Sequence, residues 1–469
     1  LQAAAEGQRL AAEVDHETAL AAAIGGSLPP LLRLVEDQFL AHEALQDSRQ
    51  LGRQPAAGDD QRVLAASRHF GVDLQRAAAH ALGGDVLGIG EHLPDLLRGG
   101  GEVLRVLPRQ NESINEEWLS DRDRFSYTAN DTAQRLTMPM LKINGEWKET
   151  DWQTALDNVA SKLTAIVNEF GAETIGARAS PSATLEDFTL LAKIMRGLGS
   201  QNIDYRLRQQ DFRADGSLSA PLLGNSISNL EKAEVVLLVG SNLRKEQPIL
   251  ASRLRKAVKN GSRVSAINNA EFDFAFPLQS NIAVAPGKQA AILAQLAVAI
   301  ASKKASSISD EIAELAATAD SNDEIASLAD NIIEAGENAQ IIIGTMAQMD
   351  ANYSLLLSLA AVITELTGAH CGRLEEGNAV AAWQASFLPF NGKEVAGKNA
   401  QEMLAEPMKA CLLFNVEPDQ DSLNGNLALD TLRETGMVIH FGNFRSAEIE
   451  EVAHVMLPLA SLHESDGSH

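Results

Sequence analysis

Apolar side chains recur every three to four residues over 152–166 and again over 184–197. Such spacing places the apolar residues on one face of an α-helix. Between the two stretches, residues 174–179 form a short β-type run. The sequence therefore predicts a helix, a strand and a second helix. The expected helix starts are the capping boxes Thr150 with Gln153 and Thr184 with Asp187, and the expected stop of the second helix is Gly197.

The clearest unit of the pattern spans residues 234–267. A strand of buried type, 234–239, leads into the tight loop Gly240-Ser241-Asn242, and Pro248 follows as a residue favoured in the first turn of a helix. Asn260-Gly261 ends this helix, and 263–267 returns as a strand. A strand–helix–strand unit of this kind predicts a parallel sheet with helices on both faces.

The same alternation continues to the end of the chain. Because its length exceeds what one core usually serves, we expect two doubly wound α/β domains. In such sheets ligands bind at loops after the carboxyl ends of strands. The expected elements are helices 287–303, 309–318, 322–335, 352–366 and 425–434 and strands 340–344, 410–416, 437–441 and 454–457, and the candidate loops are 179–183, 240–244, 344–348, 416–420 and 442–445.

The first hundred residues differ in composition from the rest of the chain. They hold 19 alanines and eight arginines but no lysine, asparagine or methionine, and their five histidines match no metal-ligand spacing. Our hypothesis is that this stretch is a wrong-frame or wrong-strand translation, joined near Gly100. The chain starts at Leu1 and stops mid-motif at His469, so we expect it to be a fragment.

Net charge and cysteine content exclude several classes of function. A formal charge of −24 argues against nucleic acid or an anionic membrane surface as partner, because both select basic patches. No apolar run approaches the roughly 20 residues that span a bilayer. Cys371 and Cys411 are the only cysteines, so this chain alone cannot supply the four thiolates of an iron–sulfur cluster.

Few residues stand out as candidates for chemistry. Gly240 and Asn242 lie in a candidate loop but lack the G-x-G-x-x-G spacing of dinucleotide sites, and Lys288 at a helix start could meet a phosphate, although a solvated lysine is favoured. These three are weak, vestigial cofactor-binding candidates. His370-Cys371 could be a redox or metal pair, but a structural pair in a Gly-flanked turn is favoured. No catalytic or metal-ligating residue is predicted.

Four segments carry a resemblance to a known family. They are GEVLRVLPRQNESINEEWLSDRDRFSY at 101–127, NIDYRLRQQDF at 202–212, LLVGSNLRKEQP at 237–248 and HVMLPLASLHESDG at 454–467. As a set, and in this order, they resemble the molybdopterin-oxidoreductase-like region of the G subunit of NADH-quinone oxidoreductase, respiratory complex I. The resemblance covers residues 101–469.

The resemblance implies an oxidoreductase subunit that helps to carry electrons from NADH to quinone. It implies a place in the peripheral arm, on the cytoplasmic face of the bacterial inner membrane, with other arm subunits as partners. It also implies 4Fe-4S and 2Fe-2S clusters in the full subunit, none of them ligated by this fragment, and no molybdopterin. No activity is expected from this chain alone.

The resemblance further implies how the domains are divided. Two Rossmann-like domains of the molybdopterin oxidoreductase superfamily are expected, one inserted in the other, so that strands 174–179 and 411–416 share a sheet that excludes 235–239. The expected divisions are an anomalous segment 1–100, a small module 101–155, a truncated α/β domain 156–204 with 368–469, and an inserted α/β domain 205–367.

The alternative is a catalytic molybdopterin oxidoreductase of the formate dehydrogenase or nitrate reductase type. In those enzymes a Cys, selenocysteine, Ser or Asp ligand follows the strand that resembles Asn-Ile-Asp here. Counting without gaps from Asn202 places this position at Gln210, a poor ligand for a high-valent metal, with Asp211 one residue further on. The amide therefore favours a vestigial, non-catalytic body.

Two groups of charged residues leave alternatives open. Arg206, Arg208 and Arg213 could be remnants of a pterin phosphate site, but we favour packing against acidic loops, since arginine pairs well with carboxylates. The alternating charges of residues 121–124 could form a docking edge for neighbouring subunits or a solvated turn.

Overall fold

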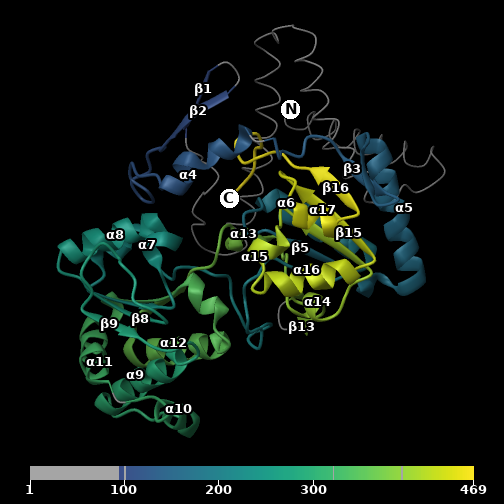
Figure 1. Ribbon diagram of the computed structural model, residues 1–469. Helices are drawn as coiled ribbons and strands as arrows, with labels where there is room; N and C mark the ends of the chain where they lie inside the picture. Colours follow the sequence, from purple (N-terminus) through teal and green to yellow (C-terminus); the bar gives the residue numbers. More distant parts are fainter. Residues whose placement is uncertain (1–94, 100–101, 132, 321, 392–393) are drawn as a thin grey trace, which may run out of the picture.

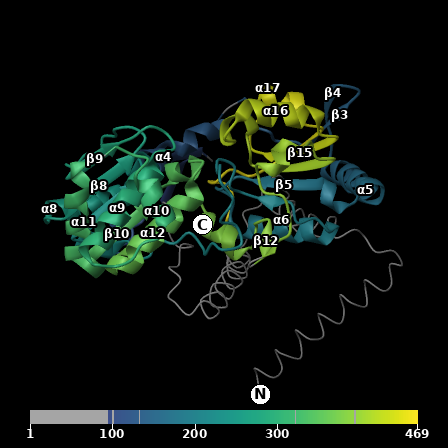
Figure 2. The same ribbon diagram turned by 90° about the horizontal axis from the view of Figure 1, so that it is seen from below.

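The computed structural model describes residues 95–99, 102–131, 133–320, 322–391 and 394–469. The hypothesis on residues 1–100 therefore lies almost entirely outside the described residues. Two α/β bodies lie side by side, and an arm formed by residues 95–99 and 102–125 lies above the body that holds α7 and α8 in Figure 1; Figure 2 shows the same pair from below. None of the described helices is both long enough and apolar enough to cross a membrane.

One body is built on a seven-stranded sheet. Its strands are β3 Met140–Ile143, β4 Glu146–Glu149, β5 Ile175–Ala179, β6 Ile203–Asp204, β14 Ala410–Phe414, β15 Met437–Gly442 and β16 Val455–Pro458. They are ordered β4-β3-β16-β15-β14-β5-β6. The five strands from β16 to β6 are parallel, and the hairpin β3–β4 adds antiparallel to β16. Strands β5 and β14 share this sheet as predicted.

Helices cover both faces of this sheet. Helix α5, Trp152–Phe170, begins at Asp151, whose carboxylate accepts a hydrogen bond from the Thr154 N–H. The Thr150–Gln153 capping box is therefore wrong, because the stronger acceptor lies one residue later. Helix α6, Leu185–Leu198, has the predicted box at Thr184, but it ends at Gly199, which adopts the left-handed φ of 95°. The other helices of this body are α13 Ala379–Gln384, α14 Glu402–Ala405, α15 Pro418–Asp421, α16 Gly425–Glu434 and α17 Ala447–Val452, with a short hairpin β12 Phe390–Asn391 and β13 Glu394–Val395.

The second body is built on a five-stranded, fully parallel sheet of order β11-β10-β7-β8-β9. Its strands are β7 Val235–Val239, β8 Arg263–Asn268, β9 Ser280–Ala283, β10 Ala339–Ile343 and β11 His370–Arg373. Its helices are α7 Leu243–Glu246, α8 Pro248–Lys259, α9 Gln289–Lys303, α10 Asp310–Ala316, α11 Asp323–Ala335 and α12 Tyr353–Thr367. Apolar residues of α9, α11 and α12 pack on one face, and those of α8 on the other. The predicted strand–helix–strand unit and the doubly wound fold class are confirmed.

The sheets do not divide at the expected boundaries. Strand β11 lies after residue 368 but pairs with β10 in the five-stranded sheet, and β3–β4, expected in a separate module, extend the seven-stranded sheet. The sequence pattern does not predict β11, because His370-Cys371-Gly372-Arg373 has no alternation of apolar and polar residues. The chain thus leaves the first sheet after β6, builds the second through β11, and then returns.

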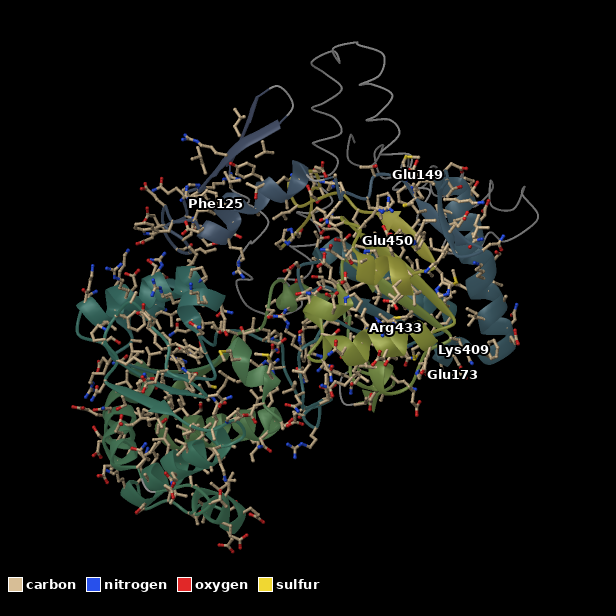
Figure 3. The ribbon with its side chains drawn as sticks, viewed as in Figure 1. Phe125, Glu149, Glu173, Lys409, Arg433 and Glu450 are labelled. Carbon is tan, nitrogen blue, oxygen red and sulfur yellow. The ribbon has the colours of Figure 1, made fainter. Side chains whose placement is uncertain are left out.

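The arm consists of the hairpin β1 Asp95–Gly99 and β2 Glu102–Leu107, followed by helix α4 Asp121–Phe125. A buried arginine of α8, Arg253, holds it to the second body. Its guanidinium donates to the main-chain carbonyls of Glu112 at 2.5 Å and Ile114 at 2.9 and 3.0 Å, and to the Glu231 carboxylate at 2.6 Å. Outside these contacts the arm exposes apolar side chains; Phe125, on α4, is 56% exposed (Figure 3).

Candidate functional site

The candidate site lies where the chain crosses between the two bodies. Residues 204–215 follow the carboxyl end of β6 and reach the candidate loops of both sheets. Arg208 Nη2 donates to the Gln420 carbonyl at 3.0 Å, and the Gln210 N–H donates to the Gln348 carbonyl at 3.0 Å. Loops expected from the strand ends of two separate sheets are thereby joined by one segment.

Arg206 occupies the centre of this segment and is 4% exposed. Its Nε and Nη2 donate to the two oxygens of Asp204 at 2.9 Å each, and Nη1 and Nη2 donate to Asp215 at 2.6 and 2.9 Å. The guanidinium also lies 4.8 Å from the Phe212 ring centroid. Burial raises the pKa of Asp215, which the contact with Arg206 partly offsets. Arg206 is thus paired twice within the chain.

The other two arginines are paired as well. Arg208 Nη1 donates to Glu376 at 2.9 Å and Nη2 to the Gln420 carbonyl at 3.0 Å. Arg213 donates to both oxygens of Asp211, at 2.9 and 2.8 Å. The prediction that these arginines pack against acidic groups is confirmed, so the crevice is not the anion-friendly one that three free arginines would make.

The two candidate metal-ligand positions are placed differently. The side chain of Gln210 is exposed, whereas Asp211 is buried. Burial opposes ionisation of Asp211, but hydrogen bonds from Arg213 and from the Ser354 N–H at 2.9 Å outweigh it and hold its pKa well below the usual range. The one carboxylate near this position is therefore already engaged on both oxygens.

The vestigial candidates Gly240, Asn242 and Lys288 lie along the carboxyl edge of the second sheet. Gly240 has φ 56°, and a Cβ there would lie 2.7 Å from Ala347, so the two loops touch and leave no room between them. The Asn242 N–H donates to Glu246 at 3.2 Å. Lys288 is exposed, as expected of a solvated lysine. Nothing in this arrangement brings the three residues onto a common ligand; their cofactor role stays a prediction.

His370 and Cys371 lie in strand β11, not in a turn. The expectation of a Gly-flanked turn is wrong because the parallel pairing with β10 extends both residues. The two side chains consequently point to opposite faces of the sheet. Burial raises the pKa of the Cys371 thiol.

The sequence pattern does not indicate several polar residues of the junction between the two bodies. Tyr205 donates to Glu375 at 2.6 Å, and Trp383 donates to Tyr205 at 3.0 Å. Glu376 and Glu246 repel each other across the junction. Glu375 and Glu376 lie two and three residues after the end of β11, so recognising that strand would have been the signal for these two carboxylates. Among the described residues, no three or more His, Cys, Asp or Glu side chains are arranged to hold a metal ion.

The partly buried carboxyl group of Glu246 makes the stability of the folded state depend on pH. Burial, together with the nearby charge of Glu376, raises its pKa to about 7 against a hydrogen bond from Asn242 that lowers it. The folded state therefore keeps a proton that the unfolded chain releases near its ordinary pKa of 4.5. Stability contributed by this group is present below pH 4.5 and is lost as the pH rises through about 7.

We expect Glu246→Gln to raise the free energy of unfolding by about 1 kcal/mol at pH 8, after allowance for partial exposure, and to leave it unchanged at pH 4.5. The amide keeps an oxygen that can accept from the Asn242 N–H. Urea unfolding at both pH values measures the difference. The exposed Glu434→Gln serves as the control for loss of a surface charge. An equal gain at both pH values would contradict the assignment.

Comparison with protein families matches residues 135–469 to the family described as molybdopterin oxidoreductase. The chain belongs to the molybdopterin oxidoreductase family. Residues 96–128 match a second family, described as NADH-ubiquinone oxidoreductase NDSU1/NuoG-like, 4Fe-4S domain. The two bodies and the arm thus match different families.

Curated relatives resemble part of the chain. The NADH-quinone oxidoreductase G subunit of Rickettsia felis is 40% identical over 164 residues, which are 35% of this chain and 23% of that protein. The same subunit of Rickettsia prowazekii is 37% identical over 162 residues, 34% of this chain and 23% of that protein. The NADH-ubiquinone oxidoreductase 75 kDa subunit of Reclinomonas americana is 32% identical over 180 residues, 35% of this chain and 25% of that protein. The match spans about a quarter of these relatives.

Among solved structures, acetylene hydratase from Pelobacter acetylenicus has a similar fold. Its TM-score is 0.56 at 13% sequence identity, and the match covers 78% of this chain and 61% of that chain. At this identity the likeness shows the fold alone. It is consistent with the fold class predicted from the sequence.

The donor set does not fit the cofactors that the two families suggest. At the expected ligand position of a molybdenum centre stands the exposed amide of Gln210, and Asp211 beside it is tied to Arg213. The matched segment 96–128 contains no cysteine, whereas a 4Fe–4S cluster is held by thiolates. No chemical step is therefore assigned to either group in this chain.

Proposed function

We propose that this chain is part of the G subunit, in the peripheral arm, of a proton-translocating NADH:quinone oxidoreductase. The subunit passes electrons from NADH towards quinone through 4Fe–4S and 2Fe–2S clusters that are carried outside this fragment. The identity to relatives of that name and the NuoG-like match next to the α/β body support this proposal.

The pairing of three arginines at the junction supports the proposal that this chain has no catalytic molybdopterin site. Arg206, Arg208 and Arg213, which could have faced a pterin phosphate, are each paired with a carboxylate of the same chain. A ligand phosphate would have to displace these contacts and leave carboxylates unpaired, one of them fully buried. The two bodies then have a positional role. They hold the cluster-bearing part of the subunit and its neighbours in the peripheral arm of the complex, and they take no molybdopterin.

The remaining parts of the proposal concern surroundings and domains. The partners are other peripheral-arm subunits, with no nucleic acid and no direct membrane span, on the cytoplasmic face of the bacterial inner membrane. We also propose that 156–204 with 368–469 and 205–367 form two domains, with strand β11 assigned to the inserted one because it pairs there.

Metal and pterin analysis tests the proposal against a catalytic molybdopterin oxidoreductase. The purified chain is incubated anaerobically with iron, sulfide, molybdate and pterin, desalted and examined by elemental analysis and spectroscopy. We expect no redox-active centre at unit stoichiometry. Stoichiometric molybdenum or tungsten would favour the catalytic alternative. A formate dehydrogenase carried through the same procedure shows that loading works.

A second experiment tests the positive part of the proposal. The full-length subunit that contains this sequence is co-expressed with the other peripheral-arm subunits, one of which carries an affinity tag. We expect it to co-purify at equal stoichiometry and to be required for electron transfer from NADH to quinone. A tagged assembly that forms and transfers electrons without it would overturn the assignment.

A further inference from the structure

Tyr205, Glu375 and Trp383 form a hydrogen-bonded chain at the junction of the two bodies. The phenol of Tyr205 donates to Glu375 Oε2 at 2.6 Å, and the indole Nε1 of Trp383 donates to the same phenolic oxygen at 3.0 Å. Tyr205 is 2% exposed, whereas Trp383 is only partly buried. A buried phenol is thus held between a base and a side chain that reaches the surface.

We propose that Tyr205 is a site of reversible one-electron oxidation, with Glu375 as the proton acceptor and Trp383 as the route of the electron to an outer-sphere one-electron oxidant at the surface. This inference does not depend on the proposed function, because no step involves NADH, quinone or an iron–sulfur cluster.

The step balances in atoms and electrons. The oxidant takes one electron from Trp383, and Tyr205 replaces it. The O–H bond of Tyr205 breaks as this electron leaves, and the proton moves along the existing hydrogen bond to Glu375 Oε2. The products are a neutral tyrosyl radical, a protonated Glu375 and an oxidant reduced by one electron. One electron from a donor and the return of the proton restore the starting state.

Three features of the surroundings act on the transfer of the electron and the proton from Tyr205. The Arg373 guanidinium lies 5.7 Å from the Trp383 ring, so a positive charge on the indole is repelled and moves on to Tyr205. Arg373 Nε also lies 3.1 Å from Glu375 Oε1, so a counter-charge lies beside the carboxylate while Oε2 accepts from the phenol. Burial raises the pKa of Tyr205 well above its usual value, so the phenol keeps its proton until it is oxidised.

The packing shields the product. The rings of Phe188 and Tyr205 meet edge to face, with centroids 6.0 Å apart, and Phe188 is fully buried. Once the phenol proton has left, the Trp383 N–H can still donate to the tyrosyl oxygen. Water and dissolved reductants are therefore kept from the radical, and one hydrogen bond to it is retained.

The chain supplies its own control tyrosine. Tyr353 is 1% exposed and lies close enough to Glu375 to feel its charge, yet no carboxylate of the described residues accepts a hydrogen bond from its hydroxyl. Because the sequence has three tyrosines, the double variant Tyr127→Phe with Tyr353→Phe keeps Tyr205 alone. Any tyrosyl signal in that variant comes from Tyr205.

The experiment uses the purified chain with a photo-oxidised ruthenium polypyridine complex as the oxidant. Transient absorption and electron paramagnetic resonance after freeze-quenching distinguish tyrosyl from tryptophanyl radicals. We expect the double variant to give a tyrosyl radical whose formation slows in D₂O. We expect the single variant Tyr205→Phe, which keeps Tyr127 and Tyr353, to lose this D₂O-sensitive radical. In the double variant we expect Glu375→Gln to slow its formation about 100-fold and Trp383→Phe to lower its yield.

Two results would overturn the inference: a folded double variant that gives no tyrosyl radical, or one whose tyrosyl radical forms at the same rate in H₂O and D₂O. Melting curves establish that each variant is folded. If Glu375→Gln does not fold, the double variant still tests proton transfer. If the hydrogen bond to Glu375 were purely structural, replacing H₂O by D₂O would not slow the formation of the radical.

Discussion

Arg206→Met is expected to lower the free energy of unfolding by about 4 kcal/mol. The Arg206 side chain is 2% exposed and those of its partners Asp204 and Asp215 are 0% and 5% exposed, so removal of the guanidinium leaves two carboxylates buried without a counter-charge. Urea unfolding at pH 7 measures the loss. Because acid protonates the freed carboxylates, the loss should shrink as the pH falls towards 4.

The matched control is Arg244→Met. Arg244 pairs with Asp273, but the two side chains are 43% and 79% exposed, and a surface pair of this kind contributes roughly 0.5 kcal/mol. A loss in Arg206→Met no larger than in the control would show that Asp204 and Asp215 do not depend on the arginine. In that case the centre of the junction would have to be hydrated.

Arg178→Met is expected to act in the opposite direction and to raise the free energy of unfolding by about 2 kcal/mol. Arg178, in β5, is 1% exposed, and its Nε and Nη1 have no hydrogen-bond partner among the described residues. Nη2 reaches only the Cys411 sulfur, at 3.9 Å. Methionine removes an unpaired buried charge and still fills the apolar space beside Leu413.

The variant Arg178→Lys tests whether the gain in stability comes from removal of the positive charge or from the change in side-chain shape. It keeps a positive charge in the same surroundings, so we expect no gain in stability from it. The three proteins are compared by urea unfolding at pH 7. Destabilisation by Arg178→Met would contradict the prediction, and would mean that an acceptor meets the guanidinium in solution.

The elements that were predicted correctly are those with a strong local signal. Helix α6 combines a capping box at Thr184 with an apolar face, and the unit from β7 to β8 combines a buried strand with Pro248 at the helix start. Local periodicity and capping describe contacts between residues a few positions apart. Strand β11 has no such signal, and its place depends on pairing with β10 some thirty residues earlier.

The candidate site was only partly predictable for the same reason. The pairing of Arg206 with acidic groups follows from nearby residues, since Asp204 and Asp215 lie within nine positions. The contact of Tyr205 with Glu375 joins residues 170 positions apart, and no spacing in the sequence announces it. Such contacts follow from the return of the chain to the first sheet, which is a property of the whole fold.

The attachment of the arm has a consequence for how this protein can diverge. Arg253 holds the arm through the carbonyls of Glu112 and Ile114, and every amino acid presents such a carbonyl. Side chains at 112 and 114 can therefore drift without loosening these bonds, whereas a change at 253 removes them all at once. Related proteins should accordingly tolerate variety at positions 112 and 114 and show little at position 253.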